Sequence, residues 1–569
     1  MPSKALFVQR LRGAKGRLTK SPAFLYEDNE AFLHRFSISE WPEYALWLSR
    51  NRLFTRQGLI QLHNEAKGCS EKPLISIIMP VYNPDPSEFK QAIDSLLWQA
   101  YPHWELCIAD DRSTNRDYLK ILGRFRDRRV KVHLNPIHAG IAGTTQYALE
   151  KASGDYIALM DQDDELCPDA LFSFVRALQK QDIDYFYSDR DMISPTGDRF
   201  MHFMKPGWSP EYLLSCNYAC HLEIYRKSLV IDVGGFRKGY EGSQDYDLVL
   251  RATEKCGNIY HHPMVLYNWR QSRNSVATNL EAKSYAFESG VKAVCDTAKR
   301  RGLPVKAAVE NKELWRGHYR LIWDDAILTN CKLTFMAVGR NEEDSRRIIA
   351  LLKQCTGAFK NCEFFSVTSC CADIHKVVKA VQRNGPVFFC DHSVSEIMVP
   401  ALIDMVGYLA IQGVSVVGCK FIDGDNKIFN AGLSISASGK ALFAYRGNSS
   451  EDCGYGAVAS VPRNVSALFP AFWGTKAENL WQKGFADHKE SYFSAAMHYF
   501  KETVKAGERI VCVPYMCLKV NTAILDYNED MKMFLKEWQE DGLNDRYYNP
   551  NLTDSYEDFG LNANFIADK

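Results

Sequence analysis

Two carboxylates stand two positions apart in the segment 160–164, which reads Met-Asp-Gln-Asp-Asp. Asp161 and Asp163 follow an apolar run typical of a buried strand, and Pro168 opens a helix after them. Two carboxylates at this spacing can hold Mg²⁺ or Mn²⁺ and leave coordination positions open for a substrate diphosphate. The alternative is an acidic turn that caps the following helix. The position of the pair at a strand end favours the metal site.

A second acidic cluster precedes an apolar helix in the segment 240–248. A carboxylate at a helix start that faces a cleft can act as a general base and remove the proton of an attacking hydroxyl group. The alternative is an N-cap of the helix, which the composition alone favours.

The elements that must position these carboxylates are short apolar strands that alternate with helices from Pro73 onward. This rhythm implies an α/β fold with a mostly parallel sheet and helices on both faces. Ligands of open α/β sheets bind at the edge where the strands end. The expected strands are 74–81, 104–109, 130–134 and 156–160, and the expected helices are 86–99, 117–125 and 141–152. The polar residues at strand ends are Asn83, Asp110, Asp111, Asp161, Asp163 and Asp164.

Composition bounds the class of protein. A single core usually stops growing at ~250–300 residues, so a chain of 569 residues is expected to form at least two domains. Its 69 basic and 69 acidic residues cancel, which argues against a nucleic-acid-binding protein because phosphate binding needs a basic surface. The 17 cysteines include no Cys-x-x-Cys pair, and Met1 opens no secretory signal. Reduced, mostly buried thiols in a cytoplasmic protein are therefore expected, with a zinc site as the less favoured alternative. No apolar run is long enough to span a membrane.

The first residues carry a concentrated positive charge. Residues 1–25 contain no acidic side chain, and apolar residues separate the basic ones. Residues 1–22 therefore form either a short basic helix in peripheral contact with the inner face of the plasma membrane or a solvated terminus. The basic residues are Lys4, Arg10, Arg12, Lys15, Arg17 and Lys20.

Several segments together resemble one family in order and spacing, glycosyltransferase family 2 with the GT-A fold. The resemblance covers Pro73 to Thr278. Two further segments, 41–52 and 205–210, resemble bacterial members that build O-antigen or other surface polysaccharides. The segments that match the family are 73–83, 110–111, 161–164, 234–237, 243–247 and 267–270.

The resemblance implies a metal-dependent, inverting glycosyltransferase. It would move a hexosyl or deoxyhexosyl group from a UDP- or dTDP-sugar to a hydroxyl group of a glycan or lipid-linked acceptor. Asp245 would be the base, and Asp161 and Asp163 would hold Mn²⁺ or Mg²⁺. The residues implied in donor binding are Pro80, Tyr82, Asn83, Asp110, Asp111, Asp161, Gln162, Trp269 and Arg270.

Two positions depart from the family pattern. Asn268 stands where relatives often place a histidine that binds the metal. His261 or His262 can replace it, although a structural role is the favoured interpretation of both. Gln244 replaces the Glu of the commoner Glu-Asp pair, and Asp245 remains.

The strand–helix rhythm restarts after Lys332, and the segments 418–432, 463–467 and 547–553 resemble second domains of tandem family 2 enzymes. The carboxylates do not recur, because Asp391 stands alone where the metal pair is expected and Glu490 has no Asp beside it. A degenerate GT-A-like domain that packs against the first, binds acceptor glycan or mediates assembly is expected. A bifunctional transferase or polymerase and a non-catalytic glycan-binding scaffold are the alternatives.

The expected organisation therefore has four parts. They are a helical lead-in with a basic N-terminus at 1–72, a catalytic GT-A domain at 73–280, a linking helix and connector at 281–331, and a second GT-A-like domain at 332–569.

Overall fold

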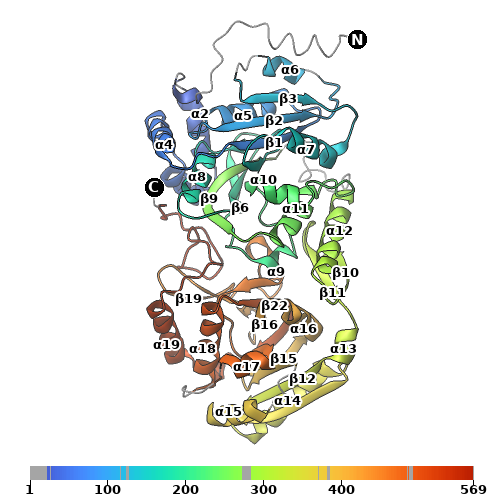
Figure 1. The fold of residues 1–569 in the computed structure, drawn as a ribbon. Helices are drawn as coiled ribbons and strands as arrows, with labels where there is room; N and C mark the ends of the chain where they lie inside the picture. The colour runs from blue at the N-terminus through green and yellow to red at the C-terminus, as the bar shows by residue number, and fades with distance from the viewer. Residues whose placement is uncertain are drawn as a thin grey trace. The chain divides into compact units, whose positions relative to one another are not determined.

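The computed structural model describes residues 22–567 except 26, 28, 116, 124–126, 272–283, 370, 381–384, 484 and 486–490 (Figure 1). The chain divides into two compact units. Unit 1 comprises Met1–Lys205, Ala219–Ala293 and Ala563–Lys569, and unit 2 comprises Pro206–Tyr218 and Val294–Asn562.

The core of unit 1 is a mixed sheet in the order β3-β2-β1-β4-β8-β6-β9-β5, with β7 beside β6. Strands β3, β2, β1 and β4 run parallel, whereas β8 is antiparallel to both of its neighbours. The predicted α/β class with a parallel-rich sheet is confirmed. The strands are β1 Ile75–Val81, β2 Trp104–Asp110, β3 Val130–Leu134, β4 Tyr156–Leu159, β5 Glu165–Leu166, β6 Tyr185–Ile193, β7 Arg199–Phe203, β8 Glu223–Arg226 and β9 Ile259–Arg270.

Helix α5 of unit 1 starts at a recognisable signal. Asp85 accepts hydrogen bonds from two backbone N–H groups of the first turn of α5 and so satisfies donors that the helix cannot. The linking helix expected within 281–331 is described from residue 284 as α12, whose residues up to Ala293 belong to unit 1 and whose later residues belong to unit 2. The helices are α5 Pro86–Leu97, α6 Asp117–Leu122, α7 Gly140–Lys151, α8 Ala170–Leu178, α10 Lys227–Asp232, α11 Gln244–Thr253 and α12 Ser284–Arg300.

The lead-in is an integral part of unit 1. The ring of Phe32 stacks on that of Trp98 with centroids 4.7 Å apart, and Tyr44 Oη donates a hydrogen bond of 2.7 Å to buried Asp191. The Asn51 side-chain amide donates a hydrogen bond of 2.9 Å to the backbone oxygen of Phe565, near the C-terminal end of the described residues. These buried contacts join the lead-in to the sheet, so it is not a separate domain. Its helices are η1 Ala23–Leu25, α2 Glu30–His34, η2 Arg35–Ser37, α3 Pro42–Asn51 and α4 Arg56–Gly68.

Unit 2 repeats the sheet of unit 1. Its order is β13-β12-β14-β21-β16-β22-β15, with β17 beside β16. This path corresponds, strand by strand, to the path β2-β1-β4-β8-β6-β9-β5 of unit 1. Each pair of neighbouring strands is parallel or antiparallel as in unit 1, and the corresponding strands occur in the same order in the sequence. The strands are β10 Val305–Glu310, β11 Tyr319–Trp323, β12 Lys332–Gly339, β13 Asn361–Thr368, β14 Pro386–Asp391, β15 Val394–Val399, β16 Val414–Ile422, β17 Ile428–Asn430, β18 Leu433–Ile435, β19 Ala441–Phe443, β20 Arg463–Val465, β21 Phe472–Lys476 and β22 Arg509–Val520.

One segment of the expected catalytic domain, Pro206–Tyr218, belongs to unit 2. Its Glu211 is fully buried and pairs with Arg509 at 3.0 Å, and Asn464 donates to the same carboxylate. A buried carboxylate needs such partners, and they are far away in the sequence. The helices of unit 2 are α9 Pro210–Leu213, α13 Ala326–Asn330, α14 Glu342–Thr356, α15 Cys371–Ala380, α16 Leu402–Ala410, η3 Tyr455–Ala457, α17 Ala477–Lys483, α18 Tyr492–Lys505, η4 Thr522–Ile524 and α19 Asn528–Glu540.

Within the described ranges, no helix combines the length and the apolar character that a membrane crossing needs. The basic segment 1–22 lies outside the described residues except for Pro22. The cysteines whose side chains are described are all free thiols.

Candidate active site

The acidic turn after β4 is built around Asp164. This side chain is fully buried, and it accepts hydrogen bonds from Tyr267 Oη at 2.6 Å and from the Arg270 N–H at 2.7 Å. Burial raises the pKa of Asp164 well above its ordinary value, and the charges of Asp163 and Asp161 raise it further. The turn is thus anchored by one buried carboxyl group, and Asp161 and Asp163 are half-buried beside it.

The residues of this turn fit a divalent cation. Asp161 and Asp163 supply oxygen atoms, the ligands that Mg²⁺ and Mn²⁺ prefer. Their negative charge is concentrated enough to raise the pKa of Asp164, and a cation would relieve that repulsion. Two protein carboxylates leave the other coordination positions to water or a diphosphate.

Arg270, one of the residues implied in donor binding, is occupied inside the protein. Its guanidinium pairs with buried Glu165 and donates to the backbone oxygen of Asp163 at 2.8 Å and to Gln91 at 3.1 Å. Arg35 from the lead-in pairs with the other oxygen of Glu165 at 2.9 Å. The described contacts of Arg270 therefore hold the acidic turn in place.

The neighbouring Trp269 lies half-buried, with the Arg190 guanidinium over its ring at 4.9 Å from the centroid. An indole face covered by a cation in this way is a favourable cation–π arrangement. The tryptophan ring is thus held by a contact inside unit 1.

Three of the polar residues at strand ends, Asn83, Asp110 and Asp111, organise the loops of unit 1. Asn83 Oδ1 accepts hydrogen bonds from the N–H groups of Thr114 and Asn115, at 2.8 and 3.0 Å. Asp110 accepts from the N–H of the loop after β2 and from a tyrosine hydroxyl of α6. Asp111 is buried and accepts from the first N–H groups of α7. These side chains shape the edge of the sheet.

The ends of β1 and β4 meet through Tyr82 and Gln162. The Tyr82 N–H donates to Gln162 Oε1 at 2.9 Å, which joins the first strand to the acidic turn. The Tyr82 side chain is 49% exposed, and its ring lies 5.1 Å from that of His138. Pro80 lies half-buried in β1, in register with Ala109 of β2. Tyr82 thus offers an exposed ring beside the turn.

Asp245 is half-buried in the first turn of α11, whose N-cap is Ser243. The Cys220 thiol donates a hydrogen bond to Asp245 Oδ2 at 3.2 Å. Burial raises the pKa of Asp245, and the hydrogen bond from Cys220 only partly opposes the shift. A carboxylate with a raised pKa is a stronger base than one in water.

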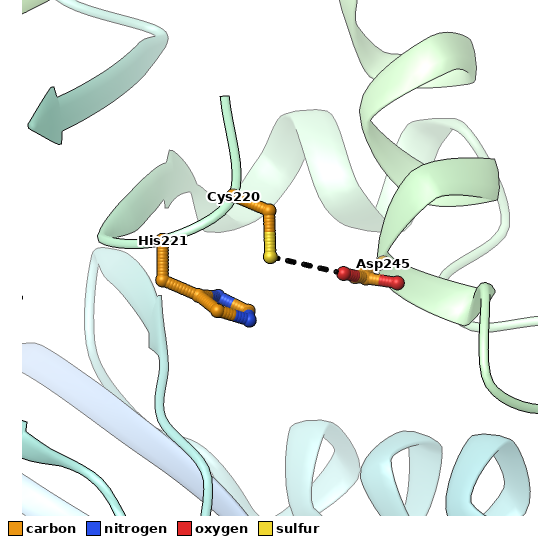
Figure 2. Close-up of side chains that lie close together, drawn as sticks. All are labelled: Cys220, His221 and Asp245. Atoms are coloured by element: carbon orange, nitrogen blue, oxygen red, sulfur yellow. Dashed lines mark hydrogen bonds between the residues drawn. The ribbon is translucent and has the colours of Figure 1, made fainter. Parts of the chain in front are cut away.

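Two further residues beside Asp245, Cys220 and His221, were not identified from the sequence. Potential ligand atoms of Cys220, His221 and Asp245 all lie within 4.8 Å of one another. Figure 2 shows the three side chains close together. Burial lowers the pKa of His221 to about 3, and the charges of Lys205 and Arg190 contribute. Its imidazole is therefore neutral at pH 7. No sequence motif marks these residues, because they meet Asp245 only through the fold.

A chain of contacts links the acidic turn to Asp245. The Asp161 N–H donates to Tyr267 Oη at 3.3 Å, and the Tyr267 ring stacks on the ring of His221 with centroids 4.9 Å apart. His221 in turn lies beside Asp245. The two acidic clusters therefore lie on either side of one stacked pair of rings.

His261 and His262 are the two histidines that could replace a metal ligand at position 268. His261 has a side-chain partner, and His262 is buried. Asn268 donates to Asp191 Oδ1 at 2.6 Å, and His261 Nε2 lies 2.8 Å from Asp189 Oδ1. Burial lowers the pKa of His262 to about 4. These contacts agree with structural roles for both histidines.

In unit 2, Asp391 lies at the end of β14. Its carboxylate contacts His392 Nδ1 at 2.8 Å and accepts a hydrogen bond from the Ser393 N–H at 2.8 Å. Glu490 lies outside the described residues. A single carboxylate that is already hydrogen-bonded locally is a poor clamp for a metal-bound diphosphate.

The sequence of this chain is similar to those of several known proteins. The sequence model of glycosyl transferase family 2 matches residues 76–233. An uncharacterized protein, y4gI of Sinorhizobium fredii, is 29% identical over 540 residues, which cover 86% of this chain and 59% of that protein. The O-antigen biosynthesis protein RfbC of Myxococcus xanthus is 30% identical over 236 residues, 41% of this chain and 18% of its own length. This chain thus spans less than two thirds of either protein.

A third relative is covered over most of its length. The UDP-Glc:alpha-D-GlcNAc-diphosphoundecaprenol beta-1,3-glucosyltransferase WfgD of Escherichia coli is 30% identical over 210 residues. These residues make up 36% of this chain and 80% of that enzyme.

Proposed function

This chain belongs to glycosyltransferase family 2, as its sequence predicts, and on that premise we propose that unit 1 is an inverting glycosyltransferase. It moves a sugar from a nucleotide-sugar to a hydroxyl group of a glycan or lipid-linked acceptor in surface polysaccharide synthesis. UDP- and dTDP-sugars are the proposed donors.

One observation carries this proposal. The acidic turn with Asp161 and the carboxylate of Asp245 are connected through Tyr267 and His221, whose rings stack 4.9 Å apart. Sugar transfer needs a group that binds the donor diphosphate and a base for the acceptor within one cleft. The arrangement supports the first role for the turn and the second for Asp245.

In the proposed reaction, the acceptor oxygen attacks the anomeric carbon on the face opposite the leaving group. The bond from the acceptor oxygen to the anomeric carbon forms as the bond from that carbon to the diphosphate oxygen breaks. The proton of the acceptor hydroxyl moves to Asp245, and the nucleoside diphosphate carries away the bonding electron pair. A single attack from the opposite face inverts the anomeric configuration.

Asp161 and Asp163 are the proposed ligands of Mn²⁺ or Mg²⁺, which when bound neutralises charge on the diphosphate. Arg270 supports this turn from within the protein, since it donates to the backbone oxygen of Asp163. Tyr82 is the proposed stacking partner of the donor base, because its ring is half-exposed beside the turn.

The polysaccharide setting is supported by the relatives. RfbC is named for O-antigen biosynthesis, and WfgD for transfer of glucose from UDP-Glc to a diphosphoundecaprenol-linked sugar. We propose that unit 2 is a non-catalytic copy that binds acceptor or supports assembly, because Asp391 is unaccompanied by a second carboxylate at this strand end.

The test is a panel of nucleotide-sugars incubated with the full chain, Mn²⁺ and candidate acceptors, with release of nucleoside diphosphate as the readout. Asp245→Asn should lower acceptor-dependent release by about 10²–10⁴-fold, the range typical of a lost general base, and leave nucleotide binding intact. Glu254→Gln, at the end of the same helix, is the control. Unchanged turnover in Asp245→Asn would disprove the assignment of the base.

A further inference from the structure

We propose that Cys220, His221 and Asp245 form an inhibitory Zn²⁺ site, distinct from the oxygen-only turn at Asp161 and Asp163. The inhibitory effect rests on the proposed role of Asp245 as the base, whereas the binding of zinc does not.

The geometry supports three protein ligands. The Cys220 sulfur lies 3.2 Å from Asp245 Oδ2, and potential ligand atoms of all three residues lie within 4.8 Å of one another (Figure 2). Ligand atoms around a tetrahedral zinc ion are about 3.3–3.8 Å apart, given zinc–ligand distances of about 2.0–2.3 Å. Small side-chain movements therefore bring the three donors to zinc. Each of the three residues is half-buried.

The donor set selects the metal. Thiolate sulfur and imidazole nitrogen favour Zn²⁺, whereas Mg²⁺ favours oxygen. The His221 imidazole is neutral, and its buried Nδ1 has no hydrogen-bond partner among the described residues. Three protein ligands leave one position of a tetrahedral ion for water.

The two acidic ligands of the cluster offset the charge of a bound dication, which the nearby cations Lys205 and Arg190 oppose. A thiolate at Cys220 and a carboxylate at Asp245 together neutralise Zn²⁺. Glu223 is also buried nearby, and Lys205 donates to the backbone oxygens of Ala219 and His221 at 2.7 Å, which holds the loop that carries the first two ligands. Burial and the charge of Asp245 raise the pKa of the Cys220 thiol, so zinc must displace its proton.

Zinc at this site would occupy the carboxylate that takes the acceptor proton. Zinc and the acceptor hydroxyl therefore compete for Asp245. Inhibition by zinc should be relieved by a chelator. It should persist in excess Mn²⁺, because Mn²⁺ is a hard ion that prefers the oxygen ligands of Asp161 and Asp163.

The experiment uses Co²⁺ as a spectroscopic substitute for zinc. In the full chain with excess Mg²⁺, Co²⁺ should produce a thiolate-to-cobalt charge-transfer band. The band should disappear in Cys220→Ala and weaken in His221→Ala, with affinity at least about tenfold lower. Cys256→Ala, which removes another half-buried thiol of unit 1, should leave it unchanged. Thermal unfolding confirms that each variant is folded. A band that survives in Cys220→Ala, or no band in the folded wild type, overturns the site.

Inhibition is measured separately, as transfer in excess Mn²⁺ with and without Zn²⁺. Zinc should inhibit the wild type and Cys256→Ala but not Cys220→Ala. Cobalt binding without transfer activity in the wild type would contradict the proposed function and leave the metal site standing. Zinc inhibition of equal strength in Cys220→Ala would show that inhibition arises elsewhere and overturn the regulatory role.

Discussion

The rings of Tyr267 and His221 stack with their centroids 4.9 Å apart, at an angle of 30°. Tyr267 reaches the acidic turn through its hydroxyl group, which donates to Asp164 and accepts from the Asp161 N–H. His221 lies beside Asp245. The stacked pair therefore couples the position of the acidic turn, the proposed metal site, to that of Asp245, the proposed base.

This coupling predicts the effect of Tyr267→Phe. The ring and its stacking on His221 remain, but the hydrogen bonds to the turn are lost. An ordinary hydrogen bond contributes about 0.5–1.5 kcal/mol and two are lost, so the Mn²⁺ concentration for half-maximal transfer should rise about fivefold or more. Transfer at saturating Mn²⁺ should change less. Titration of transfer activity with Mn²⁺ measures both quantities, and the control is Tyr101→Phe, which removes a hydroxyl group bound to the backbone oxygen of Pro73. An unchanged manganese requirement would contradict the coupling.

Arg270→Met tests whether this residue supports the turn or contacts the donor. The substitution removes a partner of Glu165, whose side chain is 2% exposed, and an unpaired buried charge costs about 3–5 kcal/mol. The free energy of unfolding in urea should fall by about 3 kcal/mol, since Arg35 still faces the same carboxylate. Arg176→Met removes an exposed pair and should cost less than about 0.5 kcal/mol. Full stability with weaker nucleotide binding would instead favour a donor contact.

A pH dependence of stability is expected from Glu105 in β2. Burial alone would raise its pKa, but hydrogen bonds from Lys131, Ser76 and Ser153 outweigh burial and lower the pKa from 4.5 to about 2. A carboxylate with a lowered pKa stabilises the fold above its unfolded-state pKa, and this contribution is lost as the pH falls through the folded-state value.

Glu105→Gln should therefore lower the free energy of unfolding by about 2 kcal/mol at pH 7. The difference from the wild type should shrink between about pH 4.5 and pH 2, as the wild-type carboxylate gains its proton. Urea unfolding at several pH values measures this difference. If the difference in unfolding free energy between Glu105→Gln and the wild type stayed constant down to about pH 2, it would contradict the lowered pKa of Glu105.

The proposal that unit 2 is not catalytic predicts opposite effects of two matched substitutions. Asp163→Asn should abolish transfer because it removes half of the proposed metal pair. Asp391→Asn should leave transfer within about twofold, as expected for a residue outside the chemistry. The two variants are compared by their initial rates of transfer at saturating donor concentration. Loss of one of two products only in Asp391→Asn would favour the bifunctional alternative.

The basic segment is tested by deletion of residues 1–21. If it contacts an anionic surface, the deletion should weaken flotation with phosphatidylserine vesicles and spare transfer to a soluble acceptor. Neutral vesicles are the control for charge. Equal flotation of both proteins would favour a solvated terminus.

The strand–helix rhythm and the residues Asp161, Asp163 and Asp245 could be recognised from the sequence, because these signals are local. An apolar run followed by carboxylates marks a strand end wherever the chain folds. The family is confirmed by the family model that matches residues 76–233 and by the similarity to WfgD. The repeated sheet of unit 2 was expected only from a restart of the rhythm, and its strand order required the fold.

Other features depended on contacts between distant segments. The family resemblance implies a donor contact for Arg270, which stays a prediction, and only the fold shows that its described partners include Glu165, Asp163 and Gln91. Segment Pro206–Tyr218 lies within the first half of the chain, and the burial of Glu211 against Arg509 assigns it to unit 2. No local sequence pattern indicates which charged side chain pairs with a buried carboxylate.

The sequence by itself determined the family, the α/β class and the acidic residues at strand ends. These three features depend only on residue types and on short spacings along the chain. Only the tertiary structure placed Cys220 and His221 beside Asp245 and stacked Tyr267 between the two acidic clusters. The physical reason is that burial and long-range packing set which groups meet and how their pKa values shift, and neither is encoded in any one segment.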